Sequence, residues 1–134
     1  MKSFRYYLEI LNEIKSIIEK MNYSLSMVIV EGRNDEKVLR EFGLKIPVYR
    51  FRESGLPNFE FIDEIAKKFK GKYITILLDF DKKGNEMSNY LSRELESKGV
   101  KIDYYFRNIL RELMIKEGIR HIEEIIAIKR KSEI

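Results

Sequence analysis

The sequence contains no cysteine and a single histidine, His121. The absence of thiols excludes disulfides, thiol catalysis and thiolate metal sites, and one imidazole is too few for an ordinary zinc site. Glutamine is also absent, whereas lysine, glutamate and isoleucine are abundant, which is a bias typical of thermophilic proteins. A metal ion bound by this chain is therefore expected to be a hard cation held by carboxylates.

Long apolar runs are lacking too. Charged side chains interrupt the first twenty residues at Lys2, Arg5, Glu9, Glu13, Lys15 and Glu19. We therefore predict no signal peptide, no membrane partner and a cytoplasmic location. The 134 residues predict one domain, 1–134, and 44% apolar residues are too many for a disordered tail. A net charge of +4 permits a polyanionic partner without requiring one.

The periodicity of apolar residues predicts alternating strands and helices. Helices are predicted over 4–21, from Asn34 or Asp35 to Phe42, over 58–69 and 85–97, and at the carboxyl end over 110–114 and 122–129. Strands are predicted over 27–30, 47–52, 73–78 and 100–104. This order favours an α/β fold with a mainly parallel four-stranded sheet between helices, in three α/β/α layers. The central part of the domain is expected at 27–104, with an extra helix within 1–24 and others within 105–134. The first helix is expected to pack on the sheet or, alternatively, to form a homodimer contact.

Acidic side chains follow two of the predicted strands. Glu31 comes directly after the strand 27–30, and Asp79 and Asp81 come after the strand 73–78. Ligands of parallel α/β sheets gather at the carboxyl ends of the strands, so we expect these three carboxylates to meet there. An all-oxygen donor set suits Mg²⁺ or Mn²⁺, which in turn favours phosphodiester chemistry.

The segments around these acids resemble the two motifs of Toprim domains. Residues 28–35 (Val-Ile-Val-Glu-Gly-Arg-Asn-Asp) resemble the first motif, a hydrophobic strand followed by Glu-Gly and an Asp three residues after the glycine. Residues 76–84 (Ile-Leu-Leu-Asp-Phe-Asp-Lys-Lys-Gly) resemble the second, Asp-x-Asp-x-x-Gly. The two motifs occur in the family's order, about fifty residues apart.

The resemblance implies a Mg²⁺-dependent site that acts on RNA or DNA, in which Asp79 and Asp81 hold the metal. Glu31 then acts as general acid or base, or as a further ligand. The chain is too short for the nucleophilic tyrosine domain of topoisomerases or the recruiting segments of primases. It is thus most similar to small stand-alone Toprim proteins such as the 5S ribosomal RNA maturation ribonuclease, working alone or in a larger complex.

Several other residues near the predicted edge are candidates for binding phosphate. They are glycines, which permit close approach of the backbone, and cations, which attract phosphate: Gly32, Arg33, Gly55, Lys82, Lys83 and Gly84. The alternative interpretation is an ordinary turn at Gly55 and a solvated basic rim, which also includes Arg50 and Arg52. Asp35 is expected to cap a helix, with a secondary role at the site, and His121 to be a surface or packing residue of the last helix.

Two rival interpretations of Asp-x-Asp-x-x-Gly remain weaker. A calcium loop of the EF-hand type would need an oxygen ligand at Lys83 and a bidentate glutamate at Tyr90. A haloacid-dehalogenase-type phosphatase also opens on this motif, but its later lysine and acidic pair are not evident. We therefore predict a nuclease-like or ribonuclease-like enzyme, with a non-catalytic nucleic-acid-binding module as the alternative.

Overall fold

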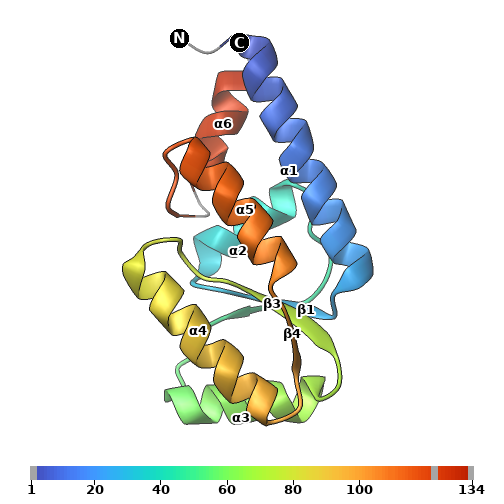
Figure 1. Cartoon of the computed structure of the whole chain (residues 1–134), viewed down its shortest axis with the longest axis vertical. Helices are drawn as coiled ribbons and strands as arrows, with labels where there is room; N and C mark the ends of the chain where they lie inside the picture. The colour runs from blue at the N-terminus through green and yellow to red at the C-terminus, as the bar shows by residue number, and fades with distance from the viewer. Residues whose placement is uncertain (1–2, 122–123, 133–134) are drawn as a thin grey trace.

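A four-stranded parallel sheet lies between two layers of helices in the computed structural model of the chain, which describes residues 3–121 and 124–132 (Figure 1). The helices are α1 (Phe4–Ser24), α2 (Arg33–Glu41), α3 (Asn58–Phe69), α4 (Lys82–Ser97), α5 (Tyr105–Lys116) and α6 (Ile125–Ser132). The strands are β1 (Met27–Val30), β2 (Val48–Arg50), β3 (Tyr73–Leu77) and β4 (Lys101–Asp103). The predicted three-layer α/β/α class is confirmed.

The sheet has the strand order β2-β1-β3-β4, and every neighbouring pair is parallel. Val30 at the end of β1 is in register with Arg50 of β2 on one side and with Leu77 of β3 on the other. The carboxyl ends of these three strands therefore lie at one edge. The residues that follow them are brought together by the register itself.

Alternation along β1 divides its side chains between two apolar cores. Val28 and Val30 pack with α1, α2, α5 and α6, whereas Met27 and Ile29 pack with α3 and α4. In Figure 1 the first group of helices lies above the sheet and the second below it. Because β1 is buried on both faces, its sequence is an unbroken apolar run rather than an alternating one.

The amino-terminal helix α1 begins where the side chain of Ser3 accepts a hydrogen bond from the backbone N–H of Tyr6, at 3.2 Å. It packs against α5 and α6 and shares their core with the strands, as expected of a helix covering the sheet. No helix within 3–121 or 124–132 is long and apolar enough to cross a membrane.

Element boundaries differ from prediction mainly near the carboxyl edge and the carboxyl end. The strand predicted over 47–52 is assigned only to Val48–Arg50, although backbone hydrogen bonds continue to Arg52. Helix α5 is longer than the predicted 110–114, because its apolar face starts at Phe106. The last helix was predicted over 122–129; residues 122 and 123 lie outside the described ranges, as do 1–2 and 133–134, and α6 begins at Ile125.

Candidate functional site

The three predicted acids do meet at the carboxyl edge of the sheet. Glu31 follows β1, and Asp79 and Asp81 follow β3, its neighbour. All three line one hollow of about 260 Å³. The other residues lining it are Phe51, Arg52, Lys83, Gly84 and Met87. The sequence pattern and the parallel register together are sufficient to place these carboxylates side by side.

Asp81 has a structural role that the sequence interpretation overlooked. The strand was predicted to end at residue 78 and the next helix to begin near Asn85, but β3 ends at Leu77 and α4 begins at Lys82. Asp81 is the N-cap of α4, and its Oδ1 accepts a hydrogen bond from the Gly84 N–H at 2.7 Å. Its Oδ2 remains available to a ligand, and the capped helix fixes the direction in which the carboxylate points.

Gly84 is required by a close approach of the backbone. A Cβ atom at this position would lie 2.0 Å from the carbonyl oxygen of Asp79 and 2.7 Å from its carbonyl carbon. Any larger residue would have to displace main-chain atoms, because no flexible side chain is available to yield. Gly84 was expected to contact phosphate. The structure shows another role, because the absence of a side chain at Gly84 allows the backbone of Asp79 to take its position.

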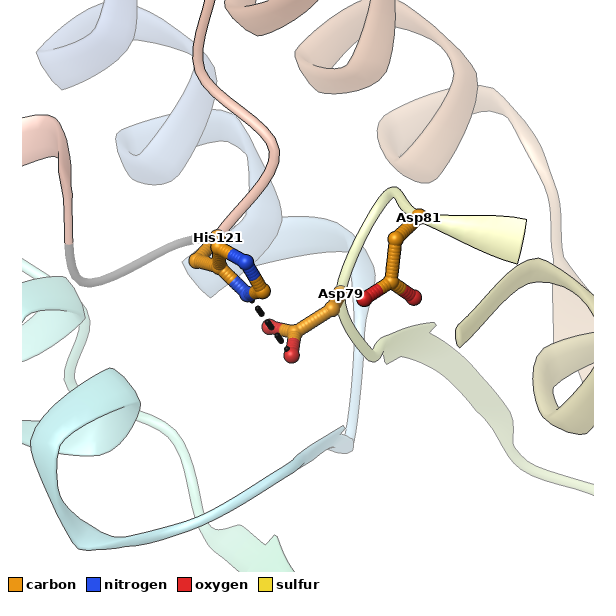
Figure 2. A group of neighbouring side chains, drawn as sticks. All are labelled: Asp79, Asp81 and His121. Atoms are coloured by element: carbon orange, nitrogen blue, oxygen red, sulfur yellow. Dashed lines mark ion pairs between the residues drawn. The ribbon is translucent and has the colours of Figure 1, made fainter. Parts of the chain in front are cut away.

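His121 belongs to the site, contrary to prediction. It lies in the connection between α5 and α6, not within the last helix, and its Nδ1 is 2.9 Å from Asp79 Oδ2 (Figure 2). This hydrogen bond raises the pKa of His121. The Phe80 N–H also donates to the Arg120 carbonyl at 2.7 Å, so the connection is bonded along the residues that follow β3.

Asp79, Asp81 and His121 offer a donor set that fits a divalent cation. One ligand atom from each lies within 4.8 Å of the other two, which is compact enough for shared coordination. Glu31 is not part of this group, although it lines the same hollow. Carboxylate oxygens suit Mg²⁺ and Mn²⁺, and an imidazole nitrogen adds a donor that later transition metals also accept.

Glu31 is largely buried and is paired with an arginine. Its side chain is 14% exposed, and Arg52 Nη2 lies 3.2 Å from its Oε2. Burial raises the pKa of Glu31, the charge of Arg52 opposes the rise, and the nearby Asp79 and Asp81 add to it. A carboxyl with a raised pKa holds a proton more readily, which suits a general acid or base.

Arg107 of α5 is a second residue that the sequence interpretation missed. It is 9% exposed, and its guanidinium donates to the carbonyls of Leu78 at 2.5 Å and Asp79 at 3.0 Å, and to Asn85 Oδ1 at 2.7 Å. Burial lowers the pKa of Arg107 to about 10, so it is still charged at neutral pH. It therefore fixes the segment between β3 and α4 and adds positive charge beneath the acids.

The amino end of α2 is already bonded to carboxylates of the chain. The Gly32 N–H donates to Asp35 Oδ2 at 3.0 Å, and the Arg33 N–H donates to Glu53 Oε1 at 2.8 Å. The N-cap of α2 is Gly32, not Asn34 or Asp35 as predicted; Asp35 is buried at the third helical position and accepts the hydrogen bond from Gly32 as in a capping box. A phosphate at this helix end would compete with Glu53.

The remaining candidates differ in how near they lie to the acids. Lys83 lines the acidic hollow, and Lys82 is exposed at the first position of α4. Gly55 has a φ of +72° before α3, where the side chain of Ser54 accepts from the Leu56 N–H at 3.2 Å. This geometry favours the interpretation of Gly55 as an ordinary turn.

Arg50 is bound within an ion-pair network. Its Nε lies 2.7 Å from Glu36 Oε1, and its Nη1 lies 3.7 Å from Glu53 Oε2. Phe51 packs edge-to-face on Phe61 in the apolar core that α3 and α4 form with the sheet. These contacts favour structural roles for both, whereas Arg52 faces the acids.

The chain is similar to several proteins named UPF0292. It is 34% identical over 119 residues to the Pyrococcus abyssi protein, covering 89% of this chain and 86% of that one. It is also 34% identical over 125 residues to the Thermococcus onnurineus protein, covering 93% and 90% of the two chains. A solved structure from Aquifex aeolicus superposes with a TM-score of 0.62 at 30% identity, covering 87% of this chain and 94% of that one. No family model matches the sequence.

Proposed function

The chain belongs to the UPF0292 protein family, and for this member we propose a divalent-metal-dependent, Toprim-type function in nucleic-acid processing, as a nuclease-like or ribonuclease-like phosphodiester hydrolase. Asp79 and Asp81 hold Mg²⁺ or Mn²⁺. Glu31 serves as general acid or base, or as a further ligand. RNA and DNA are both compatible with this chemistry.

One observation carries the proposal, namely that Glu31, Asp79 and Asp81 line a single hollow at the carboxyl edge of β1 and β3. Carboxylates that approach one another repel unless a cation or a proton is shared among them. The side chain of Asp79 is only 14% exposed, so water screens this repulsion incompletely. A divalent ion at this place would relieve the repulsion and leave coordination positions for phosphate oxygens.

The residues of the chain divide the chemistry among them. A bound divalent ion would supply charge neutralisation for the phosphoryl oxygens and acidify a water molecule. Asp79 would be held in position by His121 at its Oδ2 and by Arg107 at its carbonyl oxygen. Glu31 would take up or release the proton of the attacking or leaving oxygen.

Cations around the hollow would bind the substrate rather than transform it. Lys83 lines the hollow, and the Arg52 side chain, 73% exposed, reaches its rim from the end of β2. Both can attract phosphates on either side of the scissile bond. Arg52 would exchange its contact with Glu31 for one with phosphate, which would free Glu31 to act on a proton.

Cleavage assays with a matched charge control test this proposal. The protein is incubated with Mg²⁺ or Mn²⁺ and structured RNA, single-stranded DNA or duplex DNA, beside Asp79→Asn/Asp81→Asn. A Glu60→Gln/Asp63→Asn variant removes the same two charges from the exposed face of α3. We expect the wild type and the α3 variant to cleave at least one substrate and the Asp79/Asp81 variant to cleave none. Equal cleavage by all three would overturn the assignment.

The alternative, a non-catalytic nucleic-acid-binding module, is favoured by a specific observation. Two of the three acids already have a basic partner in the chain, Arg52 at 3.2 Å from Glu31 and His121 at 2.9 Å from Asp79. Such pairing stabilises the edge without a metal. Binding of nucleic acid without cleavage in either metal, with unchanged affinity in the Asp79/Asp81 variant, would favour this module over the enzyme.

A further inference from the structure

A second hollow lies beside the acidic one, between α2 and α6. Its volume is about 520 Å³. Polar and charged side chains of α2 form one wall and residues of α6 form the other. The lining consists of Asn34, Lys37, Val38, Glu41, Ile126 and Arg130. No residue of this groove is required by the proposed catalytic chemistry.

The cations of the groove are exposed and available. Lys37 and Arg130 face solvent from opposite walls, and among residues 3–121 and 124–132 neither makes an ion pair or a hydrogen bond. Glu41 is the acid of the lining and lies one turn beyond Lys37. Lys37 is therefore nearer than Glu41 to the amino end of α2.

A third cation connects this end of the groove with the acids. Arg33 lines the hollow that contains Glu31 and Asp79, and its side chain is 74% exposed with only a 3.9 Å ion pair to Glu53. Lys37 follows it by four residues on the same face of α2, one helical turn of about 5.4 Å away. Arg33 and Lys37 thus place two positive charges along α2, from the hollow that contains Glu31 and Asp79 to the groove.

A third, smaller hollow lies between the groove and the acidic hollow and shares lining residues with each of them. Asn34 lines both the groove and the hollow that contains Glu31 and Asp79. A chain molecule bound at Glu31 and Asp79 would therefore reach the groove at Asn34. The side chain of Ile126, partly exposed on the α6 wall, would contact sugars, while the cations meet the phosphates.

We propose that the groove between α2 and α6 binds the sugar-phosphate backbone of a single-stranded nucleic acid, whose scissile part lies at the acids. This inference rests on the proposed function and specifies its substrate. The groove has a volume of about 520 Å³, within the range of pockets that hold one small ligand, so it can receive a single strand whose bases are not paired. Arg33, Lys37 and Arg130 would contact successive phosphates, which makes binding salt-dependent.

Salt-dependent binding of the full chain tests the groove separately from catalysis. A fluorescent single-stranded oligonucleotide, as RNA and as DNA, is titrated by anisotropy in EDTA over a range of salt concentrations, so that no cleavage occurs. Lys37→Gln/Arg130→Gln is compared with Lys20→Gln/Arg93→Gln, which removes one exposed lysine and one exposed arginine from α1 and α4. Thermal unfolding of each variant verifies its fold.

Two lost phosphate contacts should reduce the slope of log K against log salt by about 1.4, because each contact to a single strand contributes about 0.7. The Lys20/Arg93 variant should keep the wild-type slope. An unchanged slope in the groove variant, or a wild-type preference for duplex, would overturn the groove while metal-dependent cleavage by the wild type still supports the proposed function. If the wild type neither binds nor cleaves any of these nucleic acids, both the groove and the proposed function are overturned.

Discussion

Substitution of Gly84 by alanine should displace Asp79 and thereby weaken the binding of a divalent metal. The added Cβ would lie 2.0 Å from the Asp79 carbonyl oxygen, whereas real Cβ contacts stay above 3.0 Å. The backbone of residue 79 or the first turn of α4 must therefore move by at least about 1 Å. The same shift would stretch the 2.7 Å hydrogen bond from the Gly84 N–H to Asp81, so both aspartates are affected.

The cost to stability has three contributions. Overpacking against main chain costs roughly 1–3 kcal/mol. Loss of the Asp81 cap costs about 1 kcal/mol more. The higher helix propensity of alanine raises the free energy of unfolding by about 0.5–1 kcal/mol. We therefore expect Gly84→Ala to lower the free energy of unfolding by roughly 1–3 kcal/mol.

The affinity for a divalent metal should fall as well, because a shift of about 1 Å misplaces two ligands at once. We expect the affinity for Mn²⁺ to fall roughly 10- to 100-fold, as when groups that orient metal ligands are removed. Denaturant unfolding measures the first effect, and titration of Mn²⁺ followed by electron paramagnetic resonance measures the second.

Gly118→Ala is the matched control. Gly118 has a φ of +74° and no atom within 4 Å of its Cβ position, so alanine strains the backbone there by roughly 1–2 kcal/mol without touching residues 79–84. It should destabilise the protein and leave Mn²⁺ affinity unchanged. If Gly84→Ala keeps wild-type stability and wild-type Mn²⁺ affinity, the close approach does not position the site and the reasoning is refuted.

Three further predictions concern Arg107, Glu36 and the effect of Mn²⁺ on stability. Arg107→Met should lower the free energy of unfolding in urea by roughly 2–4 kcal/mol, because buried carbonyls at the end of β3 lose their donor, and wild-type stability would contradict this. Glu36, partly buried but bonded to Arg50 and Arg40, has a lowered pKa, so its stabilisation is present above its unfolded value of 4.5 and is lost as pH falls through the folded pKa. Glu36→Gln should therefore be less stable than wild type at pH 7 by about 0.5–1 kcal/mol, with the two curves converging in acid. Mn²⁺ at 100 times its Kd should raise the free energy of unfolding by about 2.7 kcal/mol, and EDTA or Asp79→Asn should remove this gain.

The helices and strands of the sheet region were predicted correctly from local sequence patterns, because each element depends on residues that are close in sequence. The helix α3 occurs at the predicted 58–69, where Phe61, Ile62 and Ile65 form one apolar face. The run Met27–Val30 is buried on every side, as an unbroken apolar strand should be. Parallel pairing of β1 with β3 then brings Glu31 next to the residues after β3, as expected of acids that follow parallel strands.

The parts that prediction missed depend on contacts between distant segments. His121 meets Asp79 across 42 positions of sequence, and no local pattern of its own neighbours indicates this partner. Arg107 did leave a signal, since it shares a helical face with Leu110 and Met114 at spacings of three and seven. A charged residue within an apolar stripe marks a buried polar contact, although not which carbonyls it binds.

Anomalous diffraction from a Mn²⁺-soaked crystal tests the central assignment most directly. We predict one or more Mn²⁺ peaks at coordination distance, about 2.1 Å, from carboxylate oxygens of both Asp79 and Asp81, and no such peak in Asp79→Asn. A crystal that binds Mn²⁺ elsewhere, or whose acidic hollow stays without a peak while Arg52 and His121 keep their contacts with Glu31 and Asp79, would contradict the metal site and the chemistry proposed for it.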